Sequence, residues 1–558
     1  MKDTYQDFWE TTAQDLKNPS YQAIREAFRW DIPEFYNIAV DACDRHAANP
    51  NRLALIYDRG DGHPENWTFR DLKTSSNRLA NALQGLGIRC GDRVAVFLSQ
   101  SPQLPMTHFA IYKLGAIVVP LFTLFGPDAV VHRMSDSQAR IVITDEEHLN
   151  LILDCQRELP DLEHVIVVDG HHSGALSLDD LLAASSDTFE PVHTKSDDPA
   201  IIIYTSGTTG KAKGALHGHR VLLGHLPGVS VSHNLMPRPN DLIWTPADWA
   251  WIGGMFDVLF PALHWAIPIV AHRMPKFDPE AAFYLMARLN VRNTFLPPTA
   301  LKMMRQIEKP LDRWPLQLRT IACGGESLGE ETLRWAETSL GIHINEFYGQ
   351  TECNMVVSNC TDAFPSKPGS MGKAAPGHEV AIIDDDGNVV PSGTMGEIAV
   401  KSPNPVMFLR YWNQSAATDR KFVGDWLRTG DMGYMNEEGY IYFVGRDDDI
   451  ISSAGYRIGP AEVEESLVQH PTVLMAAVVG IPDETRGQIV KAFVRLRDGV
   501  AADDPLRREL QQWVRQKLGA HEYPREIEFV ESFPMTPSGK IQRAVLRKRE
   551  AERKQAGQ

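Results

Sequence analysis

The sequence predicts an α/β fold with a large N-terminal lobe of doubly wound sheets, a β-rich subdomain, and a small α+β domain at the C-terminus. Three observations predict it. Between about residues 70 and 350, short β-branched runs alternate with helix-length segments, after about residue 375 the runs become hairpin-like, and after residue 446 a further helix-and-strand unit begins. Strands that alternate with helical crossovers form mostly parallel sheets covered by helices on both faces.

The strands of the large lobe are predicted as β-branched runs bounded by turn residues or by helical patterns. They are RVAVFLS (93–99), RIVITD (140–145), HVIVVD (164–169), AIIIYT (200–205), IPIVAH (267–272), NTFLPP (293–298) and RTIACGG (319–325). The later segments EVAIIDDDGNVVPSG and GEIAVKS alternate around Asp-Gly turns, as hairpins do. We expect these hairpins to form the β-rich subdomain, which closes the lobe near residue 445.

The C-terminal domain is predicted over residues 447–558 and the N-terminal domain over residues 1–446. The smaller domain should contain the helix PAEVEESLVQH, the strands VLMAAVVG and IVKAFVRLR, the helix DPLRRELQQWVRQKLG, the strand REIEFVES and a basic terminal helix. In the second helix, apolar residues recur at spacings of three and four, at Leu506, Leu510, Trp513, Val514 and Leu518. One face of this helix is therefore apolar and must pack on the strands.

Composition narrows the classes of function and location. The formal net charge of −16 argues against nucleic acid as a partner, because phosphate binding needs clustered basic residues. The six cysteines include no C-x-x-C pair, which predicts reduced thiols and no zinc site. The first residues, MKDTYQDFWE, are acidic, and no segment approaches the roughly 18 to 20 apolar residues of a membrane span. We expect a cytoplasmic protein without integral membrane association, and a homo-oligomer is compatible with the sequence.

A loop of glycines and hydroxyl residues directly follows the run AIIIYT and reads YTSGTTGKAKG over residues 204–214. Glycines let successive backbone N–H groups curl round an anion, hydroxyl groups donate further hydrogen bonds, and Lys213 adds positive charge. The spacing is not that of a Walker motif. A plain surface turn is the alternative interpretation, but these residue types together indicate a site for a polyphosphate.

Further segments follow in a fixed order along the chain. They are GGES (324–327), NEFYGQTE (345–352), TGD ending at Asp431, FVGRDDD with Arg446, and TPSGK (536–540) shortly before the last helix. Together with the loop at 204–214, they resemble the adenylate-forming superfamily of acyl-CoA synthetases, adenylation domains and luciferases. The resemblance covers nearly the whole chain and is greatest to the medium-chain acyl-CoA synthetases. Ala212 stands where proline is common in this family, which should soften the loop without changing its chemistry.

The resemblance implies an enzyme that converts a carboxylic acid and ATP into an acyl-adenylate and pyrophosphate, and then transfers the acyl group to coenzyme A with release of AMP. The cofactors and co-substrates implied are ATP, Mg²⁺ and coenzyme A. By the same resemblance, the phosphates, adenine and ribose of the nucleotide are contacted by Thr205, Ser206, Gly207, Thr208, Thr209, Gly210, Lys213, Gly325, Glu326, Ser327, Glu346, Phe347, Tyr348, Gly349, Asp431 and Arg446. Tyr348 is expected against the adenine ring, and Asp431 and Arg446 at the ribose.

The resemblance identifies Lys540, Thr351 and Glu352 as catalytic residues. Thr351 should approach the α-phosphate, and Glu352 should hold Mg²⁺, because a carboxylate beside a phosphate needs a hard cation between them. Adenylation brings a carboxylate against a triphosphate, and the cation of Lys540 would relieve the repulsion and stabilise the charge that develops. The alternative for Lys540 is an ordinary exposed lysine.

For the second half-reaction, the resemblance implies that the C-terminal domain turns about a hinge at Asp448, withdraws the lysine, and presents the segment 453–457. Coenzyme A contacts are then expected from Gly455, Tyr456, Arg457 and Arg486, with the two arginines at phosphates. Family members often carry serine where Ala454 stands, so one hydrogen bond to coenzyme A would be missing. Surface ion pairs are the alternative for both arginines.

The acid pocket implied by the resemblance is lined by Trp249, Trp251, Pro298, Met303 and Gly349. Acetate-specific members carry tryptophan at the position of Gly349, so glycine favours a short- to medium-chain or aryl acid over acetate or propionate. One methylene in an apolar pocket contributes only about 1 to 3 kcal/mol, so a broad range of acids is expected. Core aromatic residues are the alternative interpretation for the two tryptophans.

Other activities fit parts of the sequence. GESLG (325–329) satisfies the G-x-S-x-G elbow of α/β-hydrolases between a strand and a helix, and histidines follow at 343, 378, 470 and 521. A hydrolase would leave the loop at 204–214 and the PSGK segment without a purpose. A nucleotide sensor on the same fold and an adenylation domain that loads a carrier protein are further alternatives.

Overall fold

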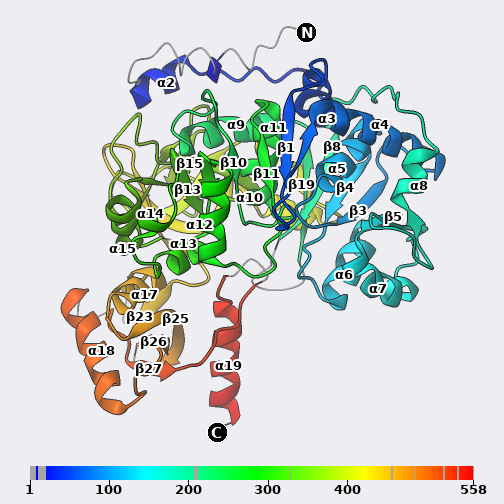
Figure 1. Cartoon of the computed structure of the whole chain (residues 1–558). Helices are drawn as coiled ribbons and strands as arrows, with labels where there is room; N and C mark the ends of the chain where they lie inside the picture. Colours follow the sequence, from blue (N-terminus) through cyan, green and yellow to red (C-terminus); the bar gives the residue numbers. More distant parts are fainter. Residues whose placement is uncertain are drawn as a thin grey trace.

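The protein is described by a computed structural model over residues 8–9, 20–205, 212–326, 328–453, 456–483, 486–518, 522–536 and 540–556. Two large sheets form the N-terminal lobe, and a smaller sheet forms the C-terminal domain at one end of that lobe (Figure 1). Among the described helices, none has the length and apolar content needed to cross a bilayer. The fold class predicted from the sequence is confirmed.

The first sheet runs from an antiparallel part into a parallel part. In spatial order its strands are β17 (Val380–Ile383), β18 (Gly396–Lys401), β21 (Trp426–Met435), β22 (Ile441–Arg446), β16 (Ser370–Ala374), β15 (Cys353–Ser358), β14 (Ile344–Gln350), β13 (Thr320–Gly324), β12 (Asn293–Phe295), β10 (Ile243–Trp244), β11 (Ile269–Ala271), β1 (Leu53–Tyr57) and β2 (Glu65–Thr68), with β20 (Phe422–Val423) beside β21. The pairs from β14 to β1 are parallel. The predicted β-rich subdomain is present, but β16 joins its strands to the parallel part, so the two parts share one sheet.

The second sheet is parallel over most of its width. Its order is β19 (Arg410–Tyr411), β9 (Gly214–Gly218), β8 (Pro199–Tyr204), β4 (Ile117–Pro120), β3 (Arg93–Phe97), β5 (Ile141–Thr144), β6 (His164–Val167) and β7 (Leu176–Ser177). Each predicted run of the large lobe overlaps a strand of one of these two sheets.

Helices cover both faces of the parallel parts of the two sheets. Those of the lobe are α2 (Tyr21–Ala27), α3 (Ile38–Ala42), α4 (Phe69–Gly85), α5 (Gln103–Lys113), α6 (Pro127–Ser137), α7 (Glu146–Cys155), α8 (Leu178–Ala183), α9 (Val221–Ser232), α10 (Ile252–Gly254), α11 (Phe260–His264), α12 (Pro279–Arg288), α13 (Pro298–Met304), α14 (Pro310–Arg313), α15 (Glu330–Trp335) and α16 (Ser415–Asp419). A π-helical turn, Met255–Leu259, joins α10 to α11.

Alternation of side chains along the strands assigns the helices to layers. On β3, Val94 belongs to the core between the two sheets, whereas its neighbour Ala95 packs with α6 and α7 on the outer face. On β13, Ala322 faces the same inner core and Ile321 faces α12 and α13. Successive residues of a strand point to opposite faces. Helices α5, α9 and α11 therefore lie between the sheets, with α6 and α7 outside one sheet and α12 and α13 outside the other.

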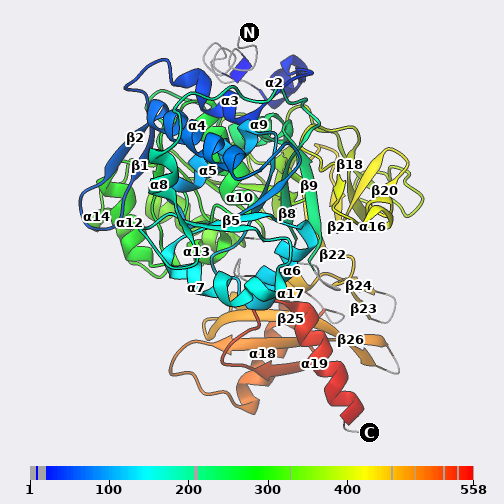
Figure 2. The ribbon, with the colours of Figure 1, turned by 90° about the vertical axis from the view of Figure 1, so that its right-hand side faces the viewer.

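The C-terminal domain packs its helices on one small sheet (Figure 2). Its strands are β24 (Tyr456–Ile458), β23 (Ile451–Ser453), β26 (Gly487–Leu496), β25 (Val473–Asp483) and β27 (Glu526–Phe529), and its helices are α17 (Pro460–Val468), α18 (Asp504–Lys517) and α19 (Arg543–Ala556). The predicted apolar face of α18 is confirmed, because Leu506, Leu510 and Val514 are buried against this sheet. The Asp503 carboxylate caps the helix by accepting a hydrogen bond from the Leu506 N–H.

Candidate active site

The motifs of the first sheet converge where its parallel strands end. Strand β13 ends at Gly324 and β14 ends at Gln350. These strands are parallel neighbours, with Gly324 opposite Phe347. In open α/β sheets, ligands bind outside the carboxyl ends of the strands. The geometry therefore places Gly325, Glu326 and the end of NEFYGQTE at such a ligand edge.

Lys540 of the C-terminal domain reaches this edge. Its Cε atom lies 3.7 Å from the position that a Cβ on Gly325 would take, and Cη2 of Trp251 lies 3.6 Å from the same position. Thr536 N–H donates to the Lys540 carbonyl at 2.7 Å, and Lys540 N–H donates to Thr536 Oγ1 at 3.0 Å. These two bonds order the backbone that carries the lysine. The other predicted motif residues Pro537, Ser538 and Gly539 lie outside the described residues.

Opposite charges surround the Lys540 ammonium group. Burial lowers the pKa of Lys540 below its usual value, the carboxylates of Glu326 and Asp431 oppose this change, and Arg446 adds to it. Burial also raises the pKa of Glu326, against the effect of Lys302 and Lys540. A poorly solvated ammonium group gains when another anion enters its surroundings, so the site is suited to a phosphate or a carboxylate.

Asp431 is a buried carboxylate held by two donors. The Tyr348 hydroxyl donates to Asp431 Oδ2 at 2.6 Å, and Gln350 Nε2 donates to the same oxygen at 3.1 Å. Asp431 lies opposite Arg446 in the register of β21 and β22. Burial raises the pKa of Asp431, while Arg446 and the bond from Tyr348 oppose the rise. Because both donors bind Oδ2, the carboxylate is fixed in orientation through one of its two oxygens.

Glu352 is the second fixed carboxylate. It is 8% exposed, and its Oε1 accepts a short hydrogen bond from the Tyr411 hydroxyl. The Lys213 ammonium group lies 5.2 Å from the centre of the Tyr411 ring. Burial raises the pKa of Tyr411, and the Glu352 carboxylate raises it further. Tyr411 thus connects the end of the glycine–hydroxyl loop to Glu352.

The donor set around Glu352 fits a magnesium ion that is shared with a nucleotide. Among the described residues, no group of three or more His, Cys, Asp or Glu could hold a metal ion by itself. Mg²⁺ is usually bound through one or two carboxylates together with substrate phosphates and waters. One buried glutamate, oriented by Tyr411 and preceded by Thr351 in the turn between β14 and β15, matches that mode.

The two ends of the glycine–hydroxyl loop are close together. Thr205 N–H donates to the Lys213 carbonyl at 2.9 Å. Gly214 follows, and a Cβ there would lie 2.6 Å from Cγ2 of Ile202, so no larger residue fits without displacement. Ser206, Gly207, Thr208, Thr209 and Gly210, all predicted phosphate contacts, lie outside the described residues, as does Ser327.

Glu346 and Phe347 pack beneath the ligand edge at the end of β13. Burial raises the pKa of Glu346 to about 7, the Leu328 N–H opposes the rise, and Glu465 adds to it. Leu328 N–H donates to Glu346 Oε1 at 3.3 Å. The ring of Phe347 lies where a Cβ on Gly324 would be, at 2.5 Å. The structure therefore places both residues beneath the backbone that carries Gly325.

Close contacts with residues of β15 leave no room for a side chain at Gly349. A Cβ at this position would lie 2.4 Å from Asn354 Oδ1 and 2.4 Å from the backbone N of Met355. The missing side chain therefore points at β15. The expectation that glycine here opens space for a longer acid does not follow from this geometry.

The other predicted pocket residues differ in their burial and in their contacts. Trp251 lies against Gly325, as described, and packs on Phe295 at 5.7 Å between ring centres. Trp249 is only 1% exposed and belongs to the core between the sheets. Pro298 is buried at the start of α13, whereas Met303 on the same helix is 40% exposed. Of these residues, Trp251 is the one whose contacts place it next to Lys540.

The predicted coenzyme A segment lies on the sheet of the C-terminal domain. Strands β23 and β24 form a hairpin, and Ser453 is paired with Gly487, next to Arg486. Arg486 N–H donates to Asp483 Oδ1 at 2.9 Å. Ala454, Gly455 and the side chains of Tyr456 and Arg457 lie outside the described part of the chain. At the predicted hinge, Asp448 lies 3.4 Å from Arg446 and 4.0 Å from Arg547.

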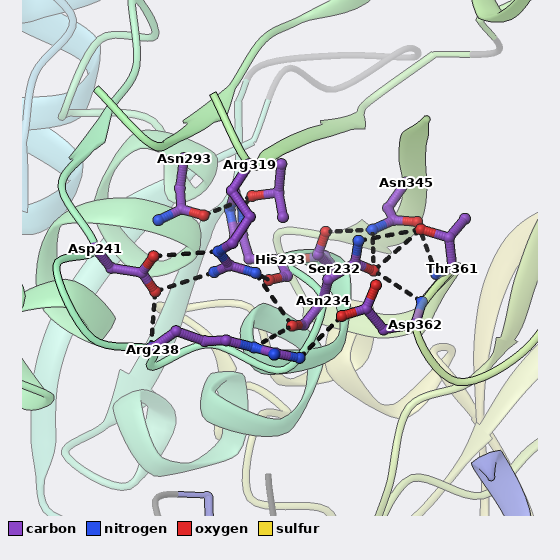
Figure 3. A network of polar contacts seen from close by, with 11 residues as sticks. Ser232, His233, Asn234, Arg238, Asp241, Asn293, Arg319, Asn345, Thr361 and Asp362 are labelled. Atoms are coloured by element: carbon purple, nitrogen blue, oxygen red, sulfur yellow. Dashed lines mark hydrogen bonds and ion pairs between the residues drawn. The ribbon is translucent and has the colours of Figure 1, made fainter. Parts of the chain in front are cut away.

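A buried polar network supports the other end of β14 (Figure 3). Asn345 donates to the Ser232 carbonyl at 3.0 Å and to Asn234 Oδ1 at 2.9 Å. Arg319, just before β13, pairs with Asp241 at 3.0 Å. Asn345 is fully buried at the amino end of its strand. This first residue of NEFYGQTE therefore anchors the strand and does not face the ligand edge.

Sequence reasoning missed Gln350, Tyr411 and Glu465. Gln350 lies inside the NEFYGQTE motif, so its position was visible, but no pattern indicated that its amide binds Asp431. Tyr411 and Glu465 lie outside every recognised motif. Their roles depend on contacts with distant residues, and only a structure reveals those.

The described histidines that follow GESLG in the sequence do not support the hydrolase alternative. Their ring nitrogens lie beside other groups: His343 beside Glu337 and Ser366, His378 beside Asn404, and His470 beside Thr472 and Glu509. His521 is outside the described residues. The comparisons below do not favour a hydrolase either.

Comparison with known proteins agrees with the motifs. The family model described as "AMP-binding enzyme" matches residues 43–412, and the model described as "AMP-binding enzyme C-terminal domain" matches residues 462–540. Acetyl-coenzyme A synthetase of Bacillus subtilis (strain 168) is 37% identical over 525 residues, which are 92% of this chain and 90% of that protein. The mitochondrial acyl-coenzyme A synthetase ACSM4 of Homo sapiens is 35% identical, over 95% of this chain and 93% of its own length.

A solved structure shows the same fold at high similarity. The anthranilate CoA ligase AuaEII, crystallised in complex with anthranoyl-AMP, superimposes with a TM-score of 0.84 at 30% sequence identity. The match covers 93% of this chain and 98% of that one. Both domains of the chain, and their order, are therefore shared with proteins of this kind.

Proposed function

The chain belongs to the AMP-binding enzyme family and is an AMP-forming acid–CoA ligase, and from this premise we propose which acid it takes and which residues carry each step. The overall reaction depends on ATP and has two stages: the acid and ATP form an acyl-adenylate with release of pyrophosphate, and the acyl group is then transferred to coenzyme A with release of AMP.

The proposed acid is short- to medium-chain or aryl. Relatives named acyl-coenzyme A synthetase and anthranilate CoA ligase support this range, since both match nearly the full length of the chain. The indole of Trp251 beside Gly325 supplies an apolar surface next to the lysine. Acetate or propionate is the alternative, which is supported by the acetyl-coenzyme A synthetase of Bacillus subtilis.

The position of Lys540 carries the proposal for the first stage. With Cε against Gly325, its ammonium group is placed beside the ligand edge, where the carboxylate of the acid must approach the α-phosphate. Two anions repel in a site of low dielectric, and a preorganised cation lowers the energy of the transition state in which their charges meet. Thr351 would donate its hydroxyl to the α-phosphate from the turn after β14.

Asp431 and Glu352 would hold the rest of the nucleotide. Because Tyr348 and Gln350 engage Oδ2 of Asp431, we assign Oδ1 to a ribose hydroxyl, with Arg446 as the second ribose contact. Glu352, oriented by Tyr411, would hold Mg²⁺, which when bound neutralises charge on phosphate oxygens. Lys213 and the residues 206–210 would bind the β- and γ-phosphates through backbone N–H groups and hydroxyls.

The second stage is assigned to the hairpin β23–β24 and the neighbouring turn. Pairing of Ser453 with Gly487 brings the end of β23 next to Arg486. Gly455 would let the pantetheine chain approach the backbone, and Arg457 and Arg486 would bind phosphates. Asp448, paired with Arg446 and Arg547, is the proposed hinge.

The test is a panel of C2 to C10 and aryl acids, each assayed with ATP and Mg²⁺ for carboxylate-dependent exchange of labelled pyrophosphate into ATP. Coenzyme A is then added, and AMP is measured. We expect exchange without coenzyme A, AMP release only with it, and highest kcat/KM for an acid longer than propionate. Exchange with acetate alone would establish the alternative, and absence of exchange with every acid would overturn the proposal.

A cytoplasmic location is also proposed. All six cysteines are unpaired, five of them buried and Cys90 exposed, as suits a reducing compartment. Because the human relative is named mitochondrial, the mitochondrial matrix is the alternative. Fractionation of cells of the source organism, followed by immunoblotting, distinguishes the two.

A further inference from the structure

A glutamate of the C-terminal domain binds the segment that follows Gly325. Glu465 Oε1 on α17 accepts a hydrogen bond of 3.1 Å from the backbone N of Glu330, the first residue of α15. The same oxygen lies 3.5 Å from the position of a Cβ on Gly329, the residue before that helix. Gly329 offers no side-chain cap, so Glu465 supplies from the other domain the acceptor that a capping residue usually provides.

The C-terminal domain therefore contacts one short segment at both of its ends. Lys540 lies over Gly325, and Glu465 binds the backbone of Glu330, five residues later. Both contacts are made by the same domain to the same connection between β13 and α15. A rigid-body movement of the domain would therefore alter both contacts.

Within the C-terminal domain, the two contacting residues are mechanically linked. Glu464, next to Glu465 on α17, accepts hydrogen bonds from Arg543 Nε at 2.9 Å and Arg543 Nη2 at 2.6 Å. Arg543 begins α19, three residues after Lys540. Bidentate pairs of arginine and carboxylate fix geometry as well as distance. The helix that carries Glu465 and the segment that carries Lys540 therefore move together.

We propose that Glu465 is a positioning residue for acyl-adenylate formation: its bond to Glu330 holds Lys540 over Gly325. The inference rests on the proposed role of Lys540 and adds to it the residue that maintains the lysine in place. Glu465 touches no reacting atom in this assignment. It acts through the lysine, so its contribution should vanish when the lysine is absent.

The experiment compares Glu465→Ala, Glu465→Gln, Lys540→Ala and the double variant. Glu552→Ala is the matched control, because Glu552 is a glutamate of another helix of the same domain, α19, and its side chain is 62% exposed. One assay measures carboxylate-dependent exchange of pyrophosphate into ATP, and the other measures AMP release when coenzyme A is added to prepared acyl-adenylate. Thermal unfolding of each variant reports folding.

We expect Glu465→Ala to slow pyrophosphate exchange about 5- to 10-fold, as for loss of one hydrogen bond of ordinary strength. Glu465→Gln, which keeps an acceptor oxygen, should retain more of the exchange rate. AMP release from acyl-adenylate by Glu465→Ala should stay within about 2-fold of the native enzyme. Glu552→Ala should match the native enzyme in both assays. In the Lys540→Ala background, Glu465→Ala should cause no further loss of exchange.

Equal loss in both assays, no loss in exchange, or an additive loss in the double variant would each overturn the inference. The Lys540→Ala variant distinguishes failure of the positioning role of Glu465 from failure of the proposed function. If Lys540→Ala lowers exchange while Glu465→Ala leaves it unchanged, only the positioning role is refuted. If Lys540→Ala exchanges at the full rate, the proposed role of the lysine fails, and the positioning role fails with it.

Discussion

The hydroxyl of Tyr348 and the carboxylate of Asp431 are joined by a hydrogen bond of 2.6 Å that connects β14 to β21. Tyr348→Phe removes this donor and leaves Oδ2 of Asp431 with Gln350. We expect KM for ATP to rise about 5- to 10-fold, equivalent to about 1 kcal/mol, with kcat changed by less than about 2-fold, because the bond orients a ground-state contact. Steady-state kinetics at saturating acid measure both. Tyr434→Phe is the control, because Tyr434 lies on β21, the strand of Asp431, and stacks on Tyr442; it should change neither value. A fall in kcat alone would contradict the assignment.

Removal of the Lys540 ammonium group should slow adenylation strongly. Lys540→Ala is expected to lower pyrophosphate exchange by roughly 10² to 10³, the effect of losing one charge-stabilising group. Lys548→Ala, whose side chain is 77% exposed, is the control and should keep the native rate. Because burial lowers the pKa of Lys540, the ammonium form is lost at lower pH than for an exposed lysine, so exchange should decline earlier on the alkaline side. A pH profile of exchange that stays flat up to pH 10 would contradict this assignment.

Glu346 should make the free energy of unfolding fall as pH rises. Its pKa is raised from 4.5 to about 7 in the folded protein, so between these values the folded state keeps a proton that the unfolded state has lost. The loss of stability should accumulate to about 3 kcal/mol by pH 7 and then level off. Glu346→Gln keeps the acceptor for Leu328 N–H and cannot ionise, so it should be more stable than the native protein at pH 8 and similar to it near pH 4.5. Urea unfolding at several pH values measures this, with the exposed Glu190→Gln as control; a constant difference at all pH values would refute it.

Gly349→Ala should destabilise the fold without selecting among acids. The added Cβ would meet backbone atoms of β15, and overpacking of this kind costs about 1 to 3 kcal/mol. Gly85→Ala in α4 is the control, since nothing lies within 4 Å of its Cβ position and alanine favours a helix. Thermal unfolding should separate the two variants, and the acid panel should give Gly349→Ala the native order of preference. A native melting temperature with a narrower acid range would instead place residue 349 in the pocket.

Buried histidines should make the free energy of unfolding fall at acidic pH. The pKa values of seven of them are lowered to about 3 or 4 by burial: His46, His108, His217, His219, His225, His233 and His378. Below pH 6.5 the unfolded chain binds these protons and the folded chain does not, so stability is lost as pH falls from 6.5 toward 4. We expect unfolding at pH 5 to take up roughly six protons from these residues, and His108→Phe to reduce the uptake by about one. Calorimetry in buffers of different ionisation enthalpy counts the protons; an uptake near zero would refute the prediction.

The parts of this fold that local sequence determines were predictable. Runs such as RIVITD form strands because β-branched residues with buried faces suit a parallel sheet, and β5 lies within that run. Asp431 and Lys540 could be predicted as site residues because each sits in a short motif, and the structure brings both into the same electrostatic surroundings. The positions of the loop motifs and of the C-terminal unit along the chain could be predicted for the same reason.

Contacts between distant residues were not predictable from the chain alone. Tyr411 binds Glu352 across 59 residues of sequence, and no pattern around either residue indicates the pair. Glycine at 349 could be noticed, but the direction of its absent side chain depends on how β15 returns beside β14. The junction of the β-rich strands with the parallel sheet through β16 likewise depends on pairing between segments that are far apart.

The single exposed cysteine makes the native enzyme convenient to label. A maleimide dye should attach at Cys90 in the N-terminal lobe and leave the five buried thiols untouched. One added cysteine on the outer surface of α18 would then give a two-colour enzyme with every native thiol retained. The proposed rotation of the small domain could then be tested with this enzyme by single-molecule energy transfer.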